Sequence, residues 1–192
     1  MSDLFWQRGW DVADNLVTAQ QLAFAKAAMD VAQRGGRMRN TALVVPKGAL
    51  SEYAPIAAEA LLKSCQPRLE AIIGRALLPA YALWRIYGHG ASLRRHRDRN
   101  ACEISISLPI FSDPADSAWP IYVTDLQGQD EGVELHSGQG ILYQGCKIAH
   151  WREPFAGSEQ YQLFLHYVLA DGPNAHLAND NREKLAIDAL IG

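Results

Sequence analysis

The stretch RIYGHGASLRRHRDRNACEISISL, residues 85–108, carries most of the information about fold and chemistry in this chain. In its last seven residues, polar and apolar side chains alternate. Because successive side chains of a strand point to opposite faces, Glu103, Ser105 and Ser107 fall on one face and the apolar side chains fall on the other. This pattern is typical of a strand that lies between an apolar core and a polar space.

The middle of the stretch, LRRHRDRN at residues 93–100, places a histidine and an aspartate two residues apart. On a strand, His96 and Asp98 project to the same side, where a metal ion could take one nitrogen and one oxygen ligand. Arg94 shares that side and is a candidate for contact with an anion. The opposite side, free for solvent or substrate, is expected to carry Arg95, Arg97 and Arg99.

A second histidine occurs in YQGCKIAHWREPFAG, residues 143–157, where His150 lies near the end of a predicted strand. Two histidines and one carboxylate, with three coordination positions open, form the facial triad of non-haem Fe(II) oxygenases. Structural zinc sites instead fill all four positions, often with thiolates. The alternative role of His150 is packing in an apolar core beside Trp151. Its combination with the HxD motif favours metal binding.

Most of the chain between Pro79 and Val168 consists of short apolar runs separated by glycine, proline and aspartate turns. This pattern predicts an antiparallel sandwich or barrel. The predicted strands are YALWRIYG (81–88), CEISISLPI (102–110), PIYVTDL (120–126), VELH (133–136), GILYQG (140–145), KIAHWRE (147–153) and YQLFLHYVLA (161–170).

The chain before Pro79 is expected to be mainly helical. Residues 17–34 predict one helix, which the glycines at 35 and 36 end. TALVVPKG, residues 41–48, is strand-like, and Pro55 begins a second helix. Pro67 is expected to break that helix, so that a separate short helix ends at Gly74.

The length of 192 residues fits one domain. We expect a mainly helical part over 1–78, a β-rich catalytic core over 79–170 and a tail over 171–192. The tail is predicted to begin as a loop and to end in a short helical stretch that packs on the sheet.

The formal net charge is −3, which disfavours nucleic acid as a partner. The three cysteines form no CxxC pair and indicate reduced thiols. The N-terminus has acids where a signal peptide needs bases, and no apolar run is long enough to span a bilayer. The sequence therefore predicts a cytoplasmic protein without a membrane partner.

Two stretches, 85–108 and 135–168, resemble the 2-oxoglutarate and Fe(II)-dependent dioxygenases, in particular the prolyl-hydroxylase-like branch. The order of motifs carries the resemblance: a tyrosine and glycines before HxD, then a glycine-bounded strand before the distal histidine. The resemblance implies an α+β, mainly β fold, a double-stranded β-helix (jelly roll) with the N-terminal helices packed outside the sheet.

The resemblance also implies functions for particular residues. Fe(II) would be bound by His96, Asp98 and His150, and Tyr87 would line the cosubstrate pocket. The implied cofactors are Fe(II), 2-oxoglutarate and O2. The implied reaction is hydroxylation of a peptidyl or amino-acid-like substrate with release of succinate and CO2.

The sequence departs from this family at one position. The family places an arginine or lysine nine or ten residues after the distal histidine, where it pairs with the C5 carboxylate of 2-oxoglutarate. Here Glu159 or Gln160 occupies that position. Arg152, on the same strand face as His150, is the first substitute, and Arg85, on the same face as Tyr87, is the second. Neutral hydrogen bonds to the carboxylate could come from Gln162, Ser105 and Ser107.

Two alternatives remain open from the sequence. The first is a nucleic-acid-binding module that uses the strand of Arg95, Arg97 and Arg99. The second is a jelly-roll protein that binds a metal without turnover. The identity of a small-molecule or peptidyl substrate and the oligomeric state are left open.

Overall fold

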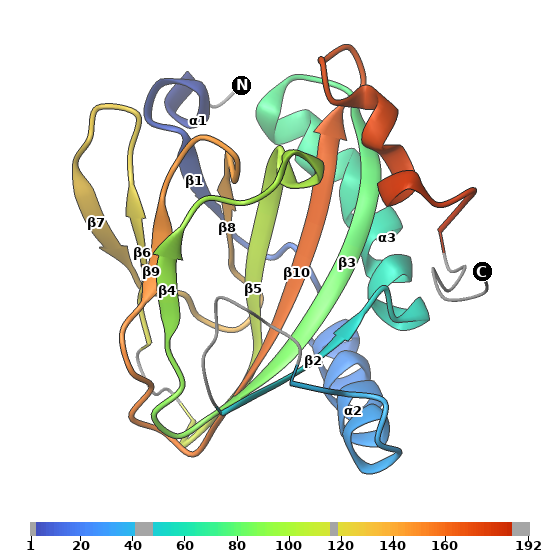
Figure 1. Ribbon diagram of the computed structural model, residues 1–192, viewed down its shortest axis with the longest axis vertical. Coiled ribbons are helices and arrows are strands. Elements are labelled where there is room, and N and C mark those ends of the chain that lie inside the picture. Colours follow the sequence, from blue (N-terminus) through green and yellow to red (C-terminus); the bar gives the residue numbers. More distant parts are fainter. Residues whose placement is uncertain (1–2, 41–47, 116–118, 186–192) are drawn as a thin grey trace.

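Two antiparallel sheets face each other in the computed structural model, which describes residues 3–40, 48–115 and 119–185 (Figure 1). The six-stranded sheet has the order β1 (Trp10–Ala13), β8 (Gly140–Tyr143), β5 (Ile104–Asp113), β10 (Glu159–Leu169), β3 (Leu77–Gly88) and β2 (Ala49–Tyr53). The four-stranded sheet has the order β4 (Leu93–His96), β9 (His150–Arg152), β6 (Ile121–Thr124) and β7 (Asp130–Val133). This arrangement confirms the predicted mainly β jelly roll.

Alternation along β10 separates the two faces of the large sheet. One set of its side chains enters the main apolar core: Tyr161, Leu163, Leu165 and Tyr167. The other set is buried toward the small sheet: Gln160, Gln162, Phe164 and His166. Helices α2 (Ala19–Arg34) and α3 (Ile56–Ile73) cover the first face, outside the sheets as predicted (Figure 1). The polar face of the large sheet is therefore directed into the space between the sheets.

Helix α2 has a side-chain cap at its start, and helix α3 has a glycine at its end. Helix α2 starts after Thr18, whose hydroxyl accepts from the backbone N–H of Gln21 while the Gln21 side chain accepts from the backbone N–H of Thr18. Helix α3 continues through Pro67, so the predicted break is wrong. Pro67 is exposed, and the buried apolar residues before and after it hold both halves of the helix against the sheet. The helix ends as predicted at Gly74, which has a left-handed φ of 71°.

Other elements differ in detail from the prediction. Helix α1 (Asp3–Arg8), β1 and β2 were not predicted, and β7 ends at Val133 where the predicted strand begins. In the tail, a 3₁₀ segment, η2 (Ala175–Asn181), packs on β3. The final helical stretch and most of the strand-like run at 41–48 lie outside the described residues. None of the described helices is long and apolar enough to cross a bilayer.

Candidate metal centre

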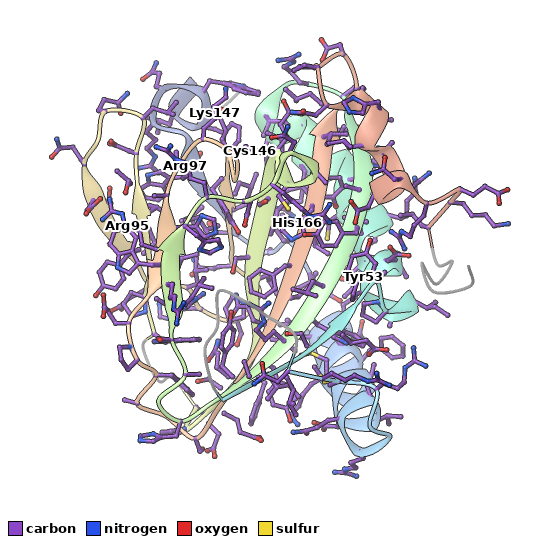
Figure 2. The ribbon with its side chains drawn as sticks, viewed as in Figure 1. Tyr53, Arg95, Arg97, Cys146, Lys147 and His166 are labelled. Atoms are coloured by element: carbon purple, nitrogen blue, oxygen red, sulfur yellow. The ribbon has the colours of Figure 1, made fainter. Side chains whose placement is uncertain are left out.

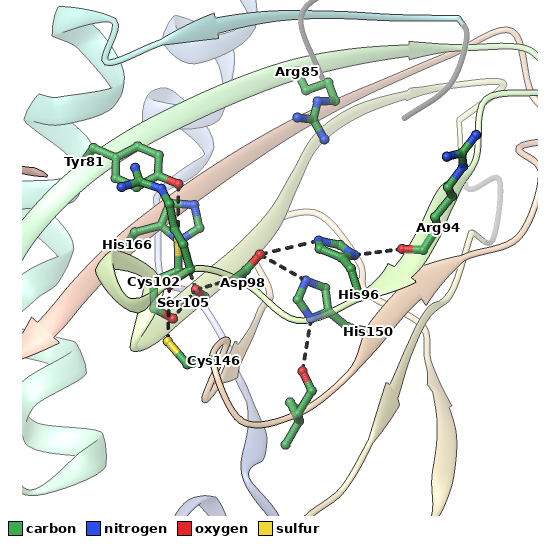
Figure 3. Close-up of polar contacts among 12 residues, drawn as sticks. Tyr81, Arg85, Arg94, His96, Asp98, Cys102, Ser105, Cys146, His150 and His166 are labelled. Carbon is green, nitrogen blue, oxygen red and sulfur yellow. Dashed lines mark hydrogen bonds and ion pairs between the residues drawn. The ribbon is translucent and has the colours of Figure 1, made fainter. Parts of the chain in front are cut away.

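Three predicted ligands meet at one end of the space between the sheets (Figure 3). His96 is the last residue of β4 and pairs in register with His150, the first residue of β9. Asp98 follows in the next loop, where its backbone N–H donates to the carbonyl of Gly145 at 2.9 Å. Its Oδ1 lies 3.4 Å from Nε2 of His96 and 3.6 Å from Nε2 of His150. Metal–ligand bonds of about 2.1 Å at right angles would place these atoms about 3 Å apart, so a small contraction suffices for binding.

The hydrogen bonds of the two imidazoles determine which nitrogen is available. Nδ1 of His96 lies 2.7 Å from the carbonyl oxygen of Arg94, and Nδ1 of His150 lies 3.4 Å from that of Ile148. Because a carbonyl only accepts, Nδ1 carries the proton in each ring. Both Nε2 atoms face Asp98, and in the neutral imidazoles each has a lone pair that could bind a metal.

The charge states of these groups also suit a cation. Burial lowers the pKa of His150 to about 4, against the opposing charge of Asp98. Burial acts to lower the pKa of His96 too, but hydrogen bonds with Asp98 and the Arg94 carbonyl raise it. Burial acts to raise the pKa of Asp98, yet the His96 hydrogen bond and the charges of nearby histidines lower it. The site thus combines a carboxylate with a neutral imidazole from His150.

A cavity of about 480 Å³ opens onto the three ligands. Apolar and aromatic side chains form much of its wall: Tyr81, Leu83, Leu93, Tyr143 and Phe164. Arg97 and Arg99 also line this cavity, so the expectation that they face away is wrong. Strand β4 ends at His96, and the side-chain alternation on which that expectation relied stops there. Arg95 does lie on the outer side, where it is paired with Asp130 (Figure 2).

No protein-family profile and no curated protein sequence matches the chain, but solved structures do. A Pseudomonas putida prolyl-4-hydroxylase aligns with a TM-score of 0.68 and 18% identity over 86% of this chain and 95% of its own. A Trichoplax adhaerens prolyl hydroxylase, solved with a hypoxia-inducible factor peptide, aligns with a TM-score of 0.68 and 12% identity over 86% of each chain. The Streptomyces hygroscopicus protein HygX, solved with nickel, 2-oxoglutarate and hygromycin B, aligns with a TM-score of 0.65 and 8% identity over 85% of this chain and 84% of its own. The chain has the 2-oxoglutarate oxygenase fold.

Within this oxygenase fold, a second group of possible ligands shares Asp98. Asp98, Cys102 and His166 have ligand atoms within 4.8 Å of one another. Burial raises the pKa of the Cys102 thiol, which disfavours the thiolate that a metal needs. Nδ1 of His166 lies 2.9 Å from the Ser105 hydroxyl, which in turn donates weakly to Asp98 at 3.4 Å. Ser105 and His166 therefore support Asp98, and Cys102 takes part in neither this support nor a metal site.

His166 and Cys102 were not singled out from the sequence. A signal for His166 was present, because it lies four residues after Gln162 on one strand and therefore shares its face. Cys102 is positioned by the short 3₁₀ segment η1 (Asn100–Cys102), which interrupts the predicted strand before Ile104. Glu103 leaves the polar face for the same reason, and its carboxylate accepts from the backbone N–H of Leu169.

Arg152 lies two residues after His150 on β9 and is 3% exposed. Its Nη1 donates to the carbonyl of Trp119, and its guanidinium stacks on the Trp119 ring at 4.6 Å. Burial lowers its pKa to about 10, so the side chain remains charged at neutral pH. Its Nε is buried without a hydrogen-bond partner among the described residues, as are Ser112 Oγ and Gln160 Oε1. All three residues line one small cavity of about 150 Å³.

Arg85 approaches from the facing sheet and lines the larger cavity together with the three ligands. Figure 3 shows its guanidinium directed toward them, whereas the Arg94 side chain extends away. Nε of Arg85 donates to Ser51 Oγ at 2.8 Å, and Nη1 donates to the hydroxyl of the fully buried Tyr87 at 3.1 Å. Gln162 lies opposite Arg85 in the register of β10 and β3 and donates to Ser107.

Proposed function

We propose that the protein is a non-haem Fe(II)- and 2-oxoglutarate-dependent oxygenase that hydroxylates a peptidyl or amino-acid-like substrate. The observation that carries this proposal is the convergence of His96, Asp98 and His150, with free Nε2 atoms and one carboxylate, on an open cavity. In the overall reaction, one oxygen atom of O2 enters succinate and the other enters the new hydroxyl group. CO2 leaves from the C1 carboxylate of 2-oxoglutarate, and the substrate loses one C–H bond.

The donor set fits the proposed metal. Two imidazole nitrogens and one carboxylate oxygen leave three coordination positions for cosubstrate and O2, as non-haem Fe(II) chemistry requires. Bound there, Fe(II) would donate electrons to O2 and so activate it for the oxidation of the substrate. The chain holds the ligand orientation through the backbone carbonyls behind each histidine and through Gly145 behind Asp98. The apolar wall of the cavity would limit access of water.

Arg152 is our first choice as the partner of the C5 carboxylate of 2-oxoglutarate. Arg152 follows His150 by two residues on β9, so both buried side chains lie on the same strand face. The uncompensated charge of Arg152, its unpartnered Nε and the unpartnered Ser112 hydroxyl are donors that suit a carboxylate. Gln160, on β10, occupies the position of the family's basic residue, so Arg152 would supply the same subsite from β9 in the facing sheet. Arg85, with the Tyr87 hydroxyl, is the second choice.

The structural neighbours support a peptide or a small molecule as the general kind of substrate. One neighbour was solved with a peptide and another with hygromycin B. We therefore keep the peptidyl or small-molecule substrate as part of the proposal. Two of the three arginines of the nucleic-acid alternative are paired with Asp130 and Asp180, which reduces the charge available to phosphates.

Anaerobic titration with Fe(II) and 2-oxoglutarate tests the proposal. We expect a visible metal-to-ligand charge-transfer band in the parent protein and at least a hundredfold weaker Fe(II) binding in His96→Ala and Asp98→Ala. Cys102→Ser is the matched control and should bind Fe(II) like the parent. Unchanged Fe(II) affinity in the first two variants would refute the metal site. A normal band without any succinate formation in air would favour the inert metal-binding alternative.

The same titration assigns the two arginines. If Arg152 binds the C5 carboxylate, Arg152→Gln should raise the dissociation constant for 2-oxoglutarate at least thirtyfold, and Arg85→Gln should change it less than threefold. The reverse result would transfer the role to Arg85.

A further inference from the structure

The space between the sheets holds two buried guanidinium groups. The exposed fractions of Arg85 and Arg152 are 7% and 3%, and neither forms an ion pair with a carboxylate among the described residues. The partners of Arg85 are neutral: the Ser51 and Tyr87 hydroxyl groups and the aromatic rings of Tyr87 and Phe164. A buried charge without a counter-charge is costly, so two such groups in one interior require an explanation.

The proposed Fe(II) and 2-oxoglutarate compensate the charge of only one of the two buried guanidinium groups. The charges of Fe(II), the Asp98 carboxylate, doubly ionised 2-oxoglutarate and Arg152 cancel. Arg85 then remains as one uncompensated positive charge on the wall of the same cavity. That cavity is also the route by which a substrate would reach the ligands, since His96 and Asp98 are only partly buried there.

The other residues that line the cavity indicate which groups a negatively charged substrate would carry besides its charge. Leu83, Leu93 and Phe164 line the wall near Arg85 and offer apolar contact. Arg97 is exposed on the same cavity, where it can attract an anion from solution. Arg99 adds little, because its guanidinium is paired with Asp180.

We propose that the primary substrate is a carboxylate with an apolar body, and that Arg85 binds its carboxylate group. This inference rests on the proposed function, because it assigns the C5 carboxylate of 2-oxoglutarate to Arg152. Nη2 of Arg85 is the donor left for the substrate, because Nε and Nη1 donate to Ser51 and Tyr87. The Tyr87 hydroxyl fixes the guanidinium, and the apolar side chains contact the body of the molecule.

A matched pair of probes tests the proposal: 3-phenylpropanoate and its neutral carboxamide. Their binding is measured by calorimetry to the anaerobic protein loaded with Fe(II) and saturating 2-oxoglutarate. We expect the carboxylate to bind at least tenfold more tightly than the carboxamide. In Arg85→Gln this preference should vanish, while the dissociation constant for 2-oxoglutarate changes less than threefold. Arg85→Lys should keep part of the preference.

The controls separate this proposal from the one on which it rests. Arg95→Gln removes an arginine from the outer surface and should leave the preference unchanged. Thermal unfolding of each variant identifies any that fails to fold, and the neutral variant Arg85→Met then takes the place of Arg85→Gln. Absence of a carboxylate preference in the parent, or its survival in the neutral Arg85 variant, overturns the proposal. If instead Arg85→Gln abolishes 2-oxoglutarate binding, the assignment of Arg152 has failed.

Discussion

At the scale of single residues, Gly145 limits what can surround Asp98. Its carbonyl holds the Asp98 backbone, and a Cβ added to Gly145 would lie 2.6 Å from Asp98 Oδ2 and 2.5 Å from the carbonyl oxygen of Cys102. These distances are far below ordinary contact, and one of the two neighbours is backbone. The loop between β8 and β9 can therefore approach the carboxylate only with glycine at this position.

We predict that Gly145→Ala weakens Fe(II) binding by about tenfold or more, because the methyl group displaces Asp98 from the two histidines. Anaerobic Fe(II) titration measures the effect. Gly35→Ala, at the end of α2, adds a methyl group far from the site and serves as the control. An unchanged Fe(II) dissociation constant in Gly145→Ala would show that Asp98 tolerates the displacement.

His166 makes the stability of the metal-free protein depend on pH. Burial lowers its pKa to about 4, whereas an unfolded histidine titrates near 6.5. Between these values the unfolded chain binds the extra proton, so stability falls as the pH falls from about 6.5 toward 4. From pH 7 to pH 5 the contribution of His166 is about 2 kcal/mol. Urea unfolding at both pH values should show a smaller loss for His166→Gln than for the parent, and exposed His136→Gln should behave like the parent.

At this scale the sequence predicted ligands better than their surroundings. His96, Asp98 and His150 were found because the HxD spacing and the distal histidine are local patterns, and the structure brings the three together. The orientation of Arg97 and Arg99 was wrong because nothing local indicated that β4 ends at His96. The support of Asp98 by Ser105 and His166 joins separate strands, and only their pairing reveals it.

At the scale of elements, helix α3 contains an internal proline and ends at a glycine. Pro67 lacks the N–H that would donate to the carbonyl of Lys63, yet the helix continues to Ile73. Gly74 ends it in the left-handed region. Tertiary packing of the apolar face therefore outweighs the local preference that led to the predicted break.

Substitutions at these two positions should act in opposite directions. Pro67→Ala restores a helical hydrogen bond at an exposed position and should stabilise the protein by about 1 kcal/mol, after the loss of proline's constraint on the unfolded chain. Gly74→Ala forces an L side chain to a positive φ and should destabilise it by about 1 kcal/mol. Denaturant unfolding measures both, and destabilisation by Pro67→Ala would mean that the proline ring itself contributes to packing or that its constraint on the unfolded chain dominates.

The missed strands share a physical reason. Strands β1 and β2 have four and five residues, and they lie at the two edges of the large sheet. Each is defined by pairing with a distant strand, β8 for β1 and β3 for β2. Such short runs contain too few alternating residues to separate a strand from a loop. The longer strands β3, β5 and β10 were all predicted.

At the scale of the whole molecule, a buried ion pair links the C-terminal tail to helix α3. Nη2 of Arg182 lies 2.6 Å from Glu59 Oε1 and also donates to the carbonyl of Ala80 at 3.1 Å. The side chains are 4% and 3% exposed. In the same tail, Asp180 pairs with Arg99 and accepts from Tyr53, so the tail also reaches the wall of the metal cavity.

We predict that Glu59→Gln destabilises the protein by about 3 kcal/mol, because it leaves Arg182 buried without its counter-charge. Thermal unfolding measures the loss. Asp171→Asn removes one member of the exposed pair with Arg75 and should leave the melting temperature unchanged. Equal melting temperatures for Glu59→Gln and the parent would mean that water replaces the carboxylate.

The position of β10 determines when the large sheet can form during synthesis of the chain. This strand lies between β5 and β3 in the centre of the large sheet, yet it is the last strand of the part of the chain that the structure describes. During synthesis, β3 and β5 leave the ribosome without the partner that joins them, and their apolar faces stay uncovered until residues 159–169 emerge. At a rate of about 5–20 residues per second, that exposure lasts several seconds. A chain cut before residue 159 would thus present two open strand edges, and cells that make it would be expected to show aggregates or chaperone complexes in place of a smaller folded core.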